Sequence, residues 1–426
     1  MRSLFLSGLM TIMYFYAQSQ TLPPVINETD VSRIENILAA DNMQGRQVFT
    51  SGIERAADFI AKEFKNAGIQ VLPGSKDGFR QSFSMVKPES IEITATLDGS
   101  TLDNNNIFVF SAASTLNVTA ADHYEKVYVK KGSNFRSILF KYLDATENVL
   151  VFVDTSFAKN FARRVNNTIP QFEGSGNRIF ILTNTDPQQF NIRIKQEIKK
   201  EHLTNLAGMI PGKSKPDEYV VFSAHYDHLG VGKPDAKGDS IYNGANDDAS
   251  GTTAVITLAK YFAKLHNNER TLVFVAFTAE EIGEFGSAYF SKKIDADKVV
   301  AMFNIEMIGT ESKWGKNSAY ITGFDKSDMG SILQKNLIIS QFKFYPDPYP
   351  EQGLFLRSDN ATLAKKGVPA HTISTSKMDS EKYYHTQGDG VETLDLDNMT
   401  EIIRAIGLSA GSVISAKDTP HRVIVE

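Results

Sequence analysis

Three hydrophobic runs that each lead to a histidine or to carboxylates constrain the fold of this chain more than any other feature. The runs and the side chains that follow them are 219–224 with His225, 271–277 with Glu280 and Glu281, and 299–305 with Glu306. Short apolar runs bounded by polar residues are typical of buried strands. Because ligands bind beyond the carboxyl ends of the strands in open α/β sheets, the pattern predicts that these side chains meet at one edge of one sheet.

Length and composition limit the possible classes of protein. A chain of 426 residues exceeds the size at which one core usually stops growing, so we expect two domains. The chain is 42% hydrophobic and 22% charged, and its formal net charge of -5 provides no broad basic surface, which argues against a nucleic-acid partner. The absence of cysteine excludes disulfides, thiolate ligands, a cysteine nucleophile and a lipid-modified cysteine.

The first 19 residues have the pattern of a signal peptide. Arg2 precedes an apolar stretch at 4–17, and Ala17-Gln18-Ser19 has the small-x-small form of a cleavage site. No later segment approaches the roughly 18 uninterrupted apolar residues that a spanning helix needs. We therefore expect an exported protein, periplasmic or secreted, without a membrane anchor.

The predicted secondary structure changes twice along the remaining sequence. Residues 30–68 read as two helices that end at Gly68. Between 88 and 199, short strands alternate with Asp- and Asn-rich turns and few catalytic groups occur. His123 within this stretch and His202 just after it have no partner motif. These features predict a β-rich domain at 88–199 inserted into a catalytic domain formed by 20–87 and 200–426.

The segment His225-Tyr226-Asp227-His228 follows the first apolar run. A lone histidine at a strand end is more often structural than a ligand. Here Asp227 can accept a hydrogen bond from the imidazole of His225, which would fix the tautomer of a metal ligand. His228 could simply line the loop, and the residues alone leave its role open.

Two pairs of adjacent acids each allow two interpretations. Asp247 and Asp248 precede a helix predicted at 252–265, where acids commonly cap, but a carboxylate there can also bridge two cations. Glu280 and Glu281 can form a solvated helix terminus, or one can bind metal while the other transfers protons. The residues alone leave both pairs open.

Two further segments complete the candidate site. Glu306 terminates an apolar strand, where a charge is costly unless it is paired or bound to a cation. Tyr384 and His385 come from a distant loop and would add a phenolic donor for a developing oxyanion and a second imidazole.

The segments SAHYDHLG, NGANDDASG, TAEEIGEFGS, NIEMIG and YYHTQGD resemble, in order and spacing, the metal and catalytic motifs of the secreted di-zinc exopeptidases of metallopeptidase family 28. Bacterial leucyl aminopeptidase and aminopeptidase S typify that family. The resemblance covers about 30–68 and 203–423. It implies an α/β fold with a mixed, largely parallel central sheet flanked by helices, and an inserted β-rich domain of protease-associated type is common among the members.

Carried over residue by residue, the resemblance implies a site for two zinc ions and a peptide or aminoacyl substrate. The implied zinc ligands are His225 and Glu306 for one ion, Glu281 and His385 for the other, and Asp247 for both. Glu280 would be the general base and acid, with Tyr384 beside it, and Asp227 and Asp248 would support the ligands. The family more often has aspartate at the position of Glu306, so this ligand is one methylene longer.

Other functions on the same fold remain open at this stage. Glutaminyl cyclases resemble the scaffold and use one zinc ion, whereas the pair His225 and Asp247 favours two. Carboxypeptidase relatives bind a C-terminal carboxylate through arginines, and Arg357 is the obvious basic candidate in the late loops. A non-catalytic receptor would be expected to have lost metal ligands. These comparisons favour an aminopeptidase.

Overall fold

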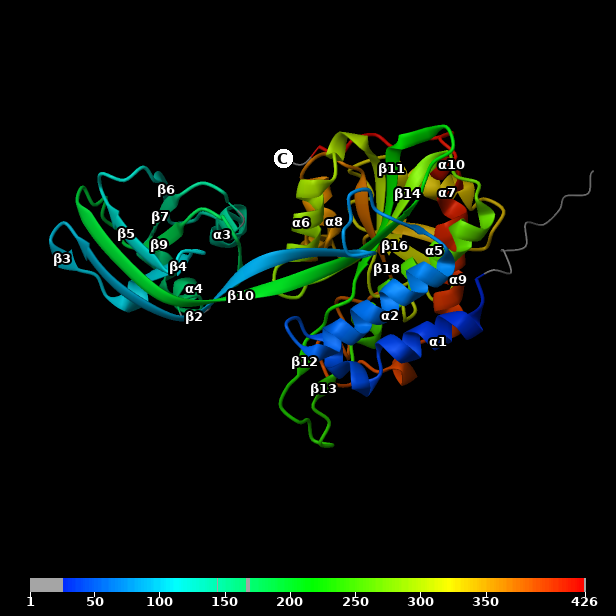
Figure 1. Cartoon of the computed structure of the whole chain (residues 1–426), viewed down its shortest axis with the longest axis horizontal. Helices are drawn as coiled ribbons and strands as arrows, with labels where there is room; N and C mark the ends of the chain where they lie inside the picture. Colours follow the sequence, from blue (N-terminus) through cyan, green and yellow to red (C-terminus); the bar gives the residue numbers. More distant parts are fainter. Residues whose placement is uncertain (1–25, 144, 166–168, 425–426) are drawn as a thin grey trace, which may run out of the picture.

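The computed structural model describes residues 26–143, 145–165 and 169–424. The expected signal peptide at 1–19 lies outside these residues. Figure 1 shows two lobes joined by two long antiparallel strands, β2 (Arg80–Leu97) and β10 (Phe190–Ile210). The domain boundaries expected at 88 and 199 fall inside these strands. In the described part of the chain, no helix has both the length and the apolar character needed to cross a bilayer.

The main lobe is built on a mixed sheet whose centre is parallel. Its order is β17-β16-β18-β15-β11-β14-β10-β2. The parallel centre comprises β14 (Arg270–Phe277), β11 (Lys215–His225), β15 (Val299–Ile305) and β18 (Ala370–Ser374). Towards one edge, β16 (Ser318–Ile321) runs antiparallel to β18 and parallel to β17 (Lys343–Pro346). The fold class expected from the sequence is confirmed.

Short strands extend the sheets at their margins. They are β1 (Gln70–Val71), β3 (Ser100–Thr101), β5 (Thr115–Thr119), β8 (Gln171–Phe172), β12 (Gly230–Val231) and β13 (Ile241–Tyr242). β1 and β5 pair with β10, whereas β12 and β13 form a separate hairpin.

Helices cover both faces of the central sheet. One face carries α1 (Glu28–Leu38), α2 (Ser51–Ala67), α5 (Ser250–Leu265), α7 (Met329–Asn336), α9 (Leu396–Ser409) and α10 (Gly411–Ile414). The other carries α6 (Phe285–Lys293) and α8 (Asn360–Ala364). The side chains of β11 alternate accordingly, with Phe222 in one core and Val221 in the other. α2 ends where the sequence predicts, at Gly68, whose φ of 76° is left-handed.

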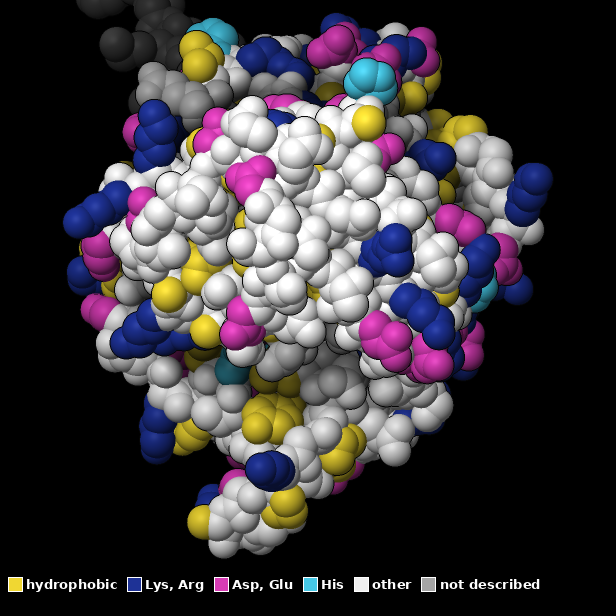
Figure 2. All heavy atoms as spheres, turned by 90° about the vertical axis from the view of Figure 1, so that its left-hand side faces the viewer, with side chains coloured by type: hydrophobic (Ala, Val, Ile, Leu, Met, Phe, Trp, Pro, Cys, Tyr) yellow, Lys and Arg dark blue, Asp and Glu magenta, His cyan; other side chains and the backbone are white. Residues whose placement is uncertain are grey.

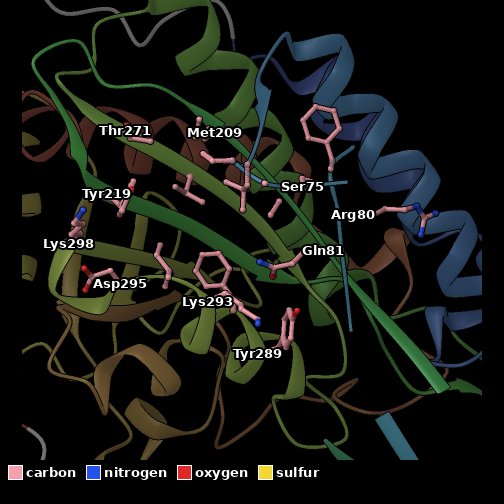
Figure 3. A pocket seen from close by; sticks show the side chains of 18 of the residues that line it. Ser75, Arg80, Gln81, Met209, Tyr219, Thr271, Tyr289, Lys293, Asp295 and Lys298 are labelled. Carbon is pink, nitrogen blue, oxygen red and sulfur yellow. The ribbon is translucent and has the colours of Figure 1, made fainter. Parts of the chain in front are cut away.

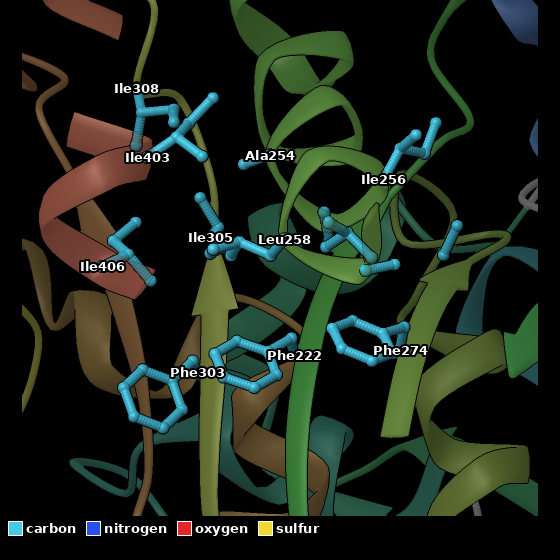
Figure 4. Packing of buried hydrophobic residues seen from close by; sticks show 14 of the residues in the cluster. Phe222, Ala254, Ile256, Leu258, Phe274, Phe303, Ile305, Ile308, Ile403 and Ile406 are labelled. Carbon is cyan, nitrogen blue, oxygen red and sulfur yellow. The ribbon is translucent and has the colours of Figure 1, made fainter. Parts of the chain in front are cut away.

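Three phenylalanines from adjacent strands form the centre of the main core (Figure 4). The ring of Phe222 on β11 stacks 5.5 Å from that of Phe274 on β14 and 4.8 Å from that of Phe303 on β15. Apolar residues of α5 and α9 pack above them. This packing fixes the register of the adjacent strands, and therefore the relative positions of the side chains that follow their carboxyl ends.

The outer lobe has a second sheet, in the order β4-β9-β7-β6. Its elements are β4 (Ile107–Phe110), β6 (Glu125–Val129), β7 (Val149–Val153), β9 (Arg178–Leu182), α3 (Phe135–Leu143) and α4 (Ala158–Ala162). The sequence predicted strands here but not the two helices. Phe108 and Phe180 stack 4.7 Å apart in a core that is separate from that of the main lobe.

The surface charge of the outer lobe is mixed. Figure 2 shows this end of the molecule with lysine, arginine, aspartate and glutamate side chains interspersed over it. Nucleic-acid binding faces concentrate positive charge in a patch or stripe. The face seen in this view has no such concentration.

Candidate metal centre

The histidines and acids singled out in the sequence converge beyond the carboxyl ends of the parallel strands. Two groups have ligand atoms within 4.8 Å of one another: His225, Asp247 and Glu306 form one, and His228, Asp247 and Glu281 the other. His225 is the last residue of β11, and Glu306 directly follows β15. Because β11 pairs in parallel with both β14 and β15, these ends meet at one edge.

Asp247 lies at the centre of the cluster and belongs to both groups. It is buried and lies in the segment Ala245–Ala249 immediately before α5, where its own backbone is not helical. Its Oδ1 lies 3.3 Å from Nε2 of His225, and its Oδ2 lies 3.2 Å from Nε2 of His385. Each oxygen of one carboxylate therefore faces a different imidazole, as a bridging ligand requires.

Glu281 and Glu306 lie on opposite sides of this bridge. Oε2 of Glu281 is 3.2 Å from Nε2 of His385, and Oε1 of Glu306 is 4.0 Å from Nε2 of His225. The other oxygen of Glu306 accepts a hydrogen bond from Ser358. The structure thus brings together all the metal ligands that the resemblance implies.

The residues present fit a pair of zinc ions. The cluster offers imidazole nitrogens and carboxylate oxygens, which are the usual zinc ligands when thiolates are absent. Nε2 of His225 is buried and, among the described residues, accepts or donates no hydrogen bond. Nδ1 of the same ring lies 3.1 Å from the carbonyl oxygen of Asp227, which can only accept, so Nδ1 carries the proton and Nε2 has a free lone pair.

The two supporting aspartates act on the backbone. Asp248 accepts from the amides of His225 (3.3 Å), Gly251 (2.9 Å) and Met307 (3.1 Å), and so ties three segments of the site together. The contact expected between the Asp227 carboxylate and His225 is corrected by the structure. That oxygen is 3.9 Å from Nδ1, because the carboxylate instead accepts from the amides of Glu280 (3.1 Å) and Glu281 (3.3 Å).

Two residues that the sequence interpretation did not assign hold the ligand loops. The fully buried Arg46 donates to the carbonyl oxygens of Leu38, Tyr226, Asn243 and Gly244, and nothing in its local sequence signals this. Asp389 accepts from the amides of Asn246 (2.8 Å) and Asp247 (3.0 Å). Asp389 ends the motif YYHTQGD, so its place in that motif was the available signal.

The cluster carries an excess of buried negative charge. Burial raises the pKa of Glu306 to about 7, with the charge of Asp247 adding to the effect. Burial also raises the pKa of Asp359 to about 7. Burial opposes protonation of His385, yet hydrogen bonds with Asp247 and Glu281 raise its pKa to about 10. Protons can offset only part of this charge, and bound cations would relieve the rest.

Glu280 differs from the acids of the two ligand groups. Its Oε2 lies 4.0 Å from Nε2 of His225, beside the cluster and outside both groups. Burial raises its pKa well above the ordinary value, and the charges of Glu306 and Glu281 act in the same direction. Such a carboxylate holds a proton more readily than an exposed one does.

A small cavity of about 50 Å³ adjoins the cluster, and Glu306, Ser358, Arg357 and Tyr384 are among the residues that line it. The half-buried ring of Tyr384 stacks on that of His385, with centroids 3.9 Å apart. Burial raises the pKa of the Tyr384 phenol further above its ordinary value, so the phenol stays protonated.

A larger cavity of about 960 Å³ lies away from the cluster (Figure 3). Tyr219, Thr271 and Lys298 line it at the amino ends of the central strands, the end opposite to the cluster. None of the clustered histidines and acids contributes to its wall. Size therefore does not identify the reactive site here; the ligating groups do.

Comparison with known proteins agrees with this geometry. Residues 205–409, which contain the whole cluster, match Peptidase family M28. The chain is 29% identical over 210 residues to a probable leucine aminopeptidase of Arthroderma otae, covering 47% of this chain and 55% of that protein. It is 32% identical over 212 residues to leucine aminopeptidase 1 of Emericella nidulans, covering 46% and 52%.

The fold of the chain is also found in solved structures. A zinc aminopeptidase from Bacillus subtilis aligns with a TM-score of 0.56 at 14% identity, covering 96% of this chain and 100% of that one. An aminopeptidase from Aneurinibacillus sp. strain AM-1 aligns with a TM-score of 0.53 at 18% identity, covering 94% and 96%. In sequence, the chain spans about half the length of the two fungal relatives.

Proposed function

We propose that this protein is an aminopeptidase that holds two zinc ions and removes N-terminal residues from peptides. The observation that carries the proposal is the orientation of Asp247, whose two oxygens face His225 and His385 respectively. The match of residues 205–409 to Peptidase family M28 and the names of the fungal relatives support the peptidase activity.

In this proposal the ligands divide between the two ions. His225 and Glu306 hold one ion, Glu281 and His385 hold the other, and Asp247 binds both. When bound, zinc lowers the pKa of a coordinated water and polarises a carbonyl group. The longer side chain of Glu306 is accommodated because Ser358 donates to its second oxygen and holds it in place.

Glu280 is the proposed general base and acid. It lies beside the cluster without joining a ligand group, so its carboxylate is free to accept a proton from water and to deliver it to the leaving amine. Its raised pKa favours keeping that proton between the two steps. Tyr384, protonated and lining the adjacent cavity, would donate a hydrogen bond to the developing oxyanion.

The test is a substrate panel with defined metal content. The metal-free protein is loaded with zinc and given a free aminoacyl amide, its N-acetylated counterpart, a C-terminally free blocked peptide and an N-terminal glutaminyl peptide. We expect cleavage of the free aminoacyl amide and of no N-blocked substrate. Pyroglutamate formation would assign the protein to the cyclases, and cleavage of the N-blocked peptide from its C-terminus would make Arg357 a carboxylate anchor.

We also propose that the protein is exported, to the periplasm or outside the cell, after removal of residues 1–19. The basic residue, the apolar stretch and the small-x-small site support this proposal. Fractionation followed by N-terminal sequencing tests it: a mature chain that begins at about Gln20 is expected, and a cytoplasmic protein that retains Met1 would refute it.

A further inference from the structure

His228 is a third imidazole in the ligand cluster, and the proposed zinc assignment leaves it without a role. It follows Asp227 in the loop after β11 and is only 2% exposed. Its Nδ1 lies 2.7 Å from Oε1 of Glu281 and 3.9 Å from Oδ2 of Asp247. Its backbone amide donates to the carbonyl oxygen of Arg46, which anchors the loop.

The contact with Glu281 has the length of a hydrogen bond that involves a charge. A carboxylate oxygen can only accept, so Nδ1 of His228 donates. The same nitrogen cannot also offer a lone pair to a metal. Glu281 has a second oxygen, Oε2, which faces Nε2 of His385 at 3.2 Å. The two oxygens of Glu281 therefore face two different imidazoles, and only one of these rings is a zinc ligand in the proposed site.

The surroundings of Nε2, the other ring nitrogen of His228, agree with a tautomer that carries its proton on Nδ1. Nε2 of His228 is buried and has no hydrogen-bond partner among the residues that the structure describes. A proton on that nitrogen would be a buried donor without an acceptor, and orphaned donors are rarer in proteins than unsatisfied acceptors. With the proton on Nδ1, the donor is satisfied by Glu281.

We propose that His228 is a positioning residue for Glu281, which together with His385 would hold one of the two zinc ions. By donating to Oε1 of Glu281, it keeps that oxygen away from the ion and leaves Oε2 as the oxygen that binds. The inference rests on the proposed two-zinc function and deepens it. Residues that orient metal ligands in this way typically change metal affinity by about 10- to 100-fold when they are removed.

The test measures zinc affinity, with the full-length chain, for the wild type and three variants. His228→Ala removes the donor. His228→Asn retains an N–H donor near the position of Nδ1 but is a poor zinc ligand. His371→Asn is the matched control, because His371 is an equally buried histidine whose ring contacts Thr322 and Ser327 instead of the cluster. Stripped protein is titrated with Zn²⁺ against a chromophoric chelator, and far-UV circular dichroism confirms folding.

We expect His228→Ala to weaken the affinity for the zinc ion held by Glu281 and His385 by about 10- to 100-fold. The affinity for the ion held by His225 and Glu306 should stay within about 3-fold of the wild type. His228→Asn and the control should stay within about 3-fold at both sites. Unchanged affinity in His228→Ala would refute the positioning role. An equal loss in both His228 variants would also refute it, because the ring nitrogen would then be a ligand itself. Loading with Co²⁺ gives a second readout, since loss of a direct ligand changes its visible absorption and loss of a hydrogen bond changes it little.

Failure of this inference is distinguishable from failure of the proposed function. A wild-type chain that binds fewer than two zinc ions, or cleaves no free aminoacyl amide, would refute the proposed function. A wild-type chain that does both, alongside a His228→Ala variant with unchanged zinc affinity, would refute the role of His228 alone.

Discussion

The main lobe and the outer lobe both contain parallel strands followed by polar residues, but they place those residues in different environments. In the main lobe, His225 at the end of β11 is buried and its Nε2 has no partner among the described residues. In the outer lobe, Asp154 directly follows β7, and its carboxylate accepts from the amide of Ser156 at 2.8 Å as a local cap. A polar residue at a strand end is thus a candidate ligand only where the local chain does not already satisfy it.

The acids of the two lobes differ in the same way. Burial raises the pKa of Glu280 and Glu306 in the main lobe. In the outer lobe, hydrogen bonds with nearby residues lower the pKa of the exposed Asp122 and of the half-buried Asp154. Burying like charges together costs free energy that a cation can recover, whereas capping a turn stabilises it without a ligand. The main lobe carries the unfavourable arrangement, and that marks the functional site.

The largest expected effect comes from removing the acid that stands beside the ligands. Glu280→Gln should retain both zinc ions and lose about 10²- to 10⁴-fold in kcat, because general acid–base catalysis contributes about that much. Asp154→Asn is the matched strand-end substitution in the outer lobe and should leave kcat unchanged. A Glu280→Gln enzyme as active as the wild type, measured at equal zinc content, would contradict the conclusion that the acids of the main lobe are functional and those of the outer lobe are not.

The next effect concerns the bridge. Asp247→Asn removes the charge from the carboxylate whose two oxygens face His225 and His385, so the bound zinc should fall below two per chain. Elemental analysis of dialysed protein gives the stoichiometry directly. Two retained zinc ions would show that Asp247 supports the loop without bridging the metals.

Much of the fold was predictable because its signals are local. The apolar runs at 107–110, 149–153 and 299–305 coincide with β4, β7 and β15. Gly68 ends α2 as predicted. α3 and α4 were missed because they lie among strand-like segments of the outer lobe, where apolar residues of the two kinds of element look alike.

The candidate site was predictable where a ligand follows a strand or lies in a motif, as His225 and Asp247 do. Contacts that depend on loop geometry were not. Whether the backbone or the side chain of Asp227 meets an imidazole is decided by the turn after β11. The role of Arg46 depends on carbonyl oxygens up to 198 residues away in the chain, and no spacing rule reaches that far.

The lobes should also respond separately to damage in their cores. Phe180→Ala removes a fully buried ring that stacks on Phe108 and should destabilise the outer lobe by about 3–5 kcal/mol. Because the two cores are separate, we expect calorimetry to show a lowered outer-lobe transition with zinc content unchanged. Phe222→Ala, the main-lobe counterpart, should lower zinc retention. Loss of zinc in Phe180→Ala would show that the lobes fold as one unit.

The smallest expected effect is on the pH dependence of stability. Burial raises the pKa of Glu35 from 4.5 to about 8, although Thr253 donates to its carboxylate at 2.7 Å. Below pH 4.5 the carboxyl is protonated in both the folded and the unfolded chain. Between pH 4.5 and about 8 the unfolded chain releases the proton and the folded chain keeps it, so this group makes the main lobe less stable as the pH rises.

Glu35→Gln removes that dependence, so the main-lobe melting temperature should fall less between pH 5 and pH 8 in the variant than in the wild type. Other buried acids contribute equally to both proteins, so the difference between their two melting-temperature profiles is due to Glu35. Glu147→Gln in the outer lobe is the exposed control and should leave the main-lobe pH profile unchanged. Parallel profiles for Glu35→Gln and the wild type would show that Glu35 is ionised when folded. The contrast between buried acids in one lobe and capped acids in the other would then rest on the metal cluster alone.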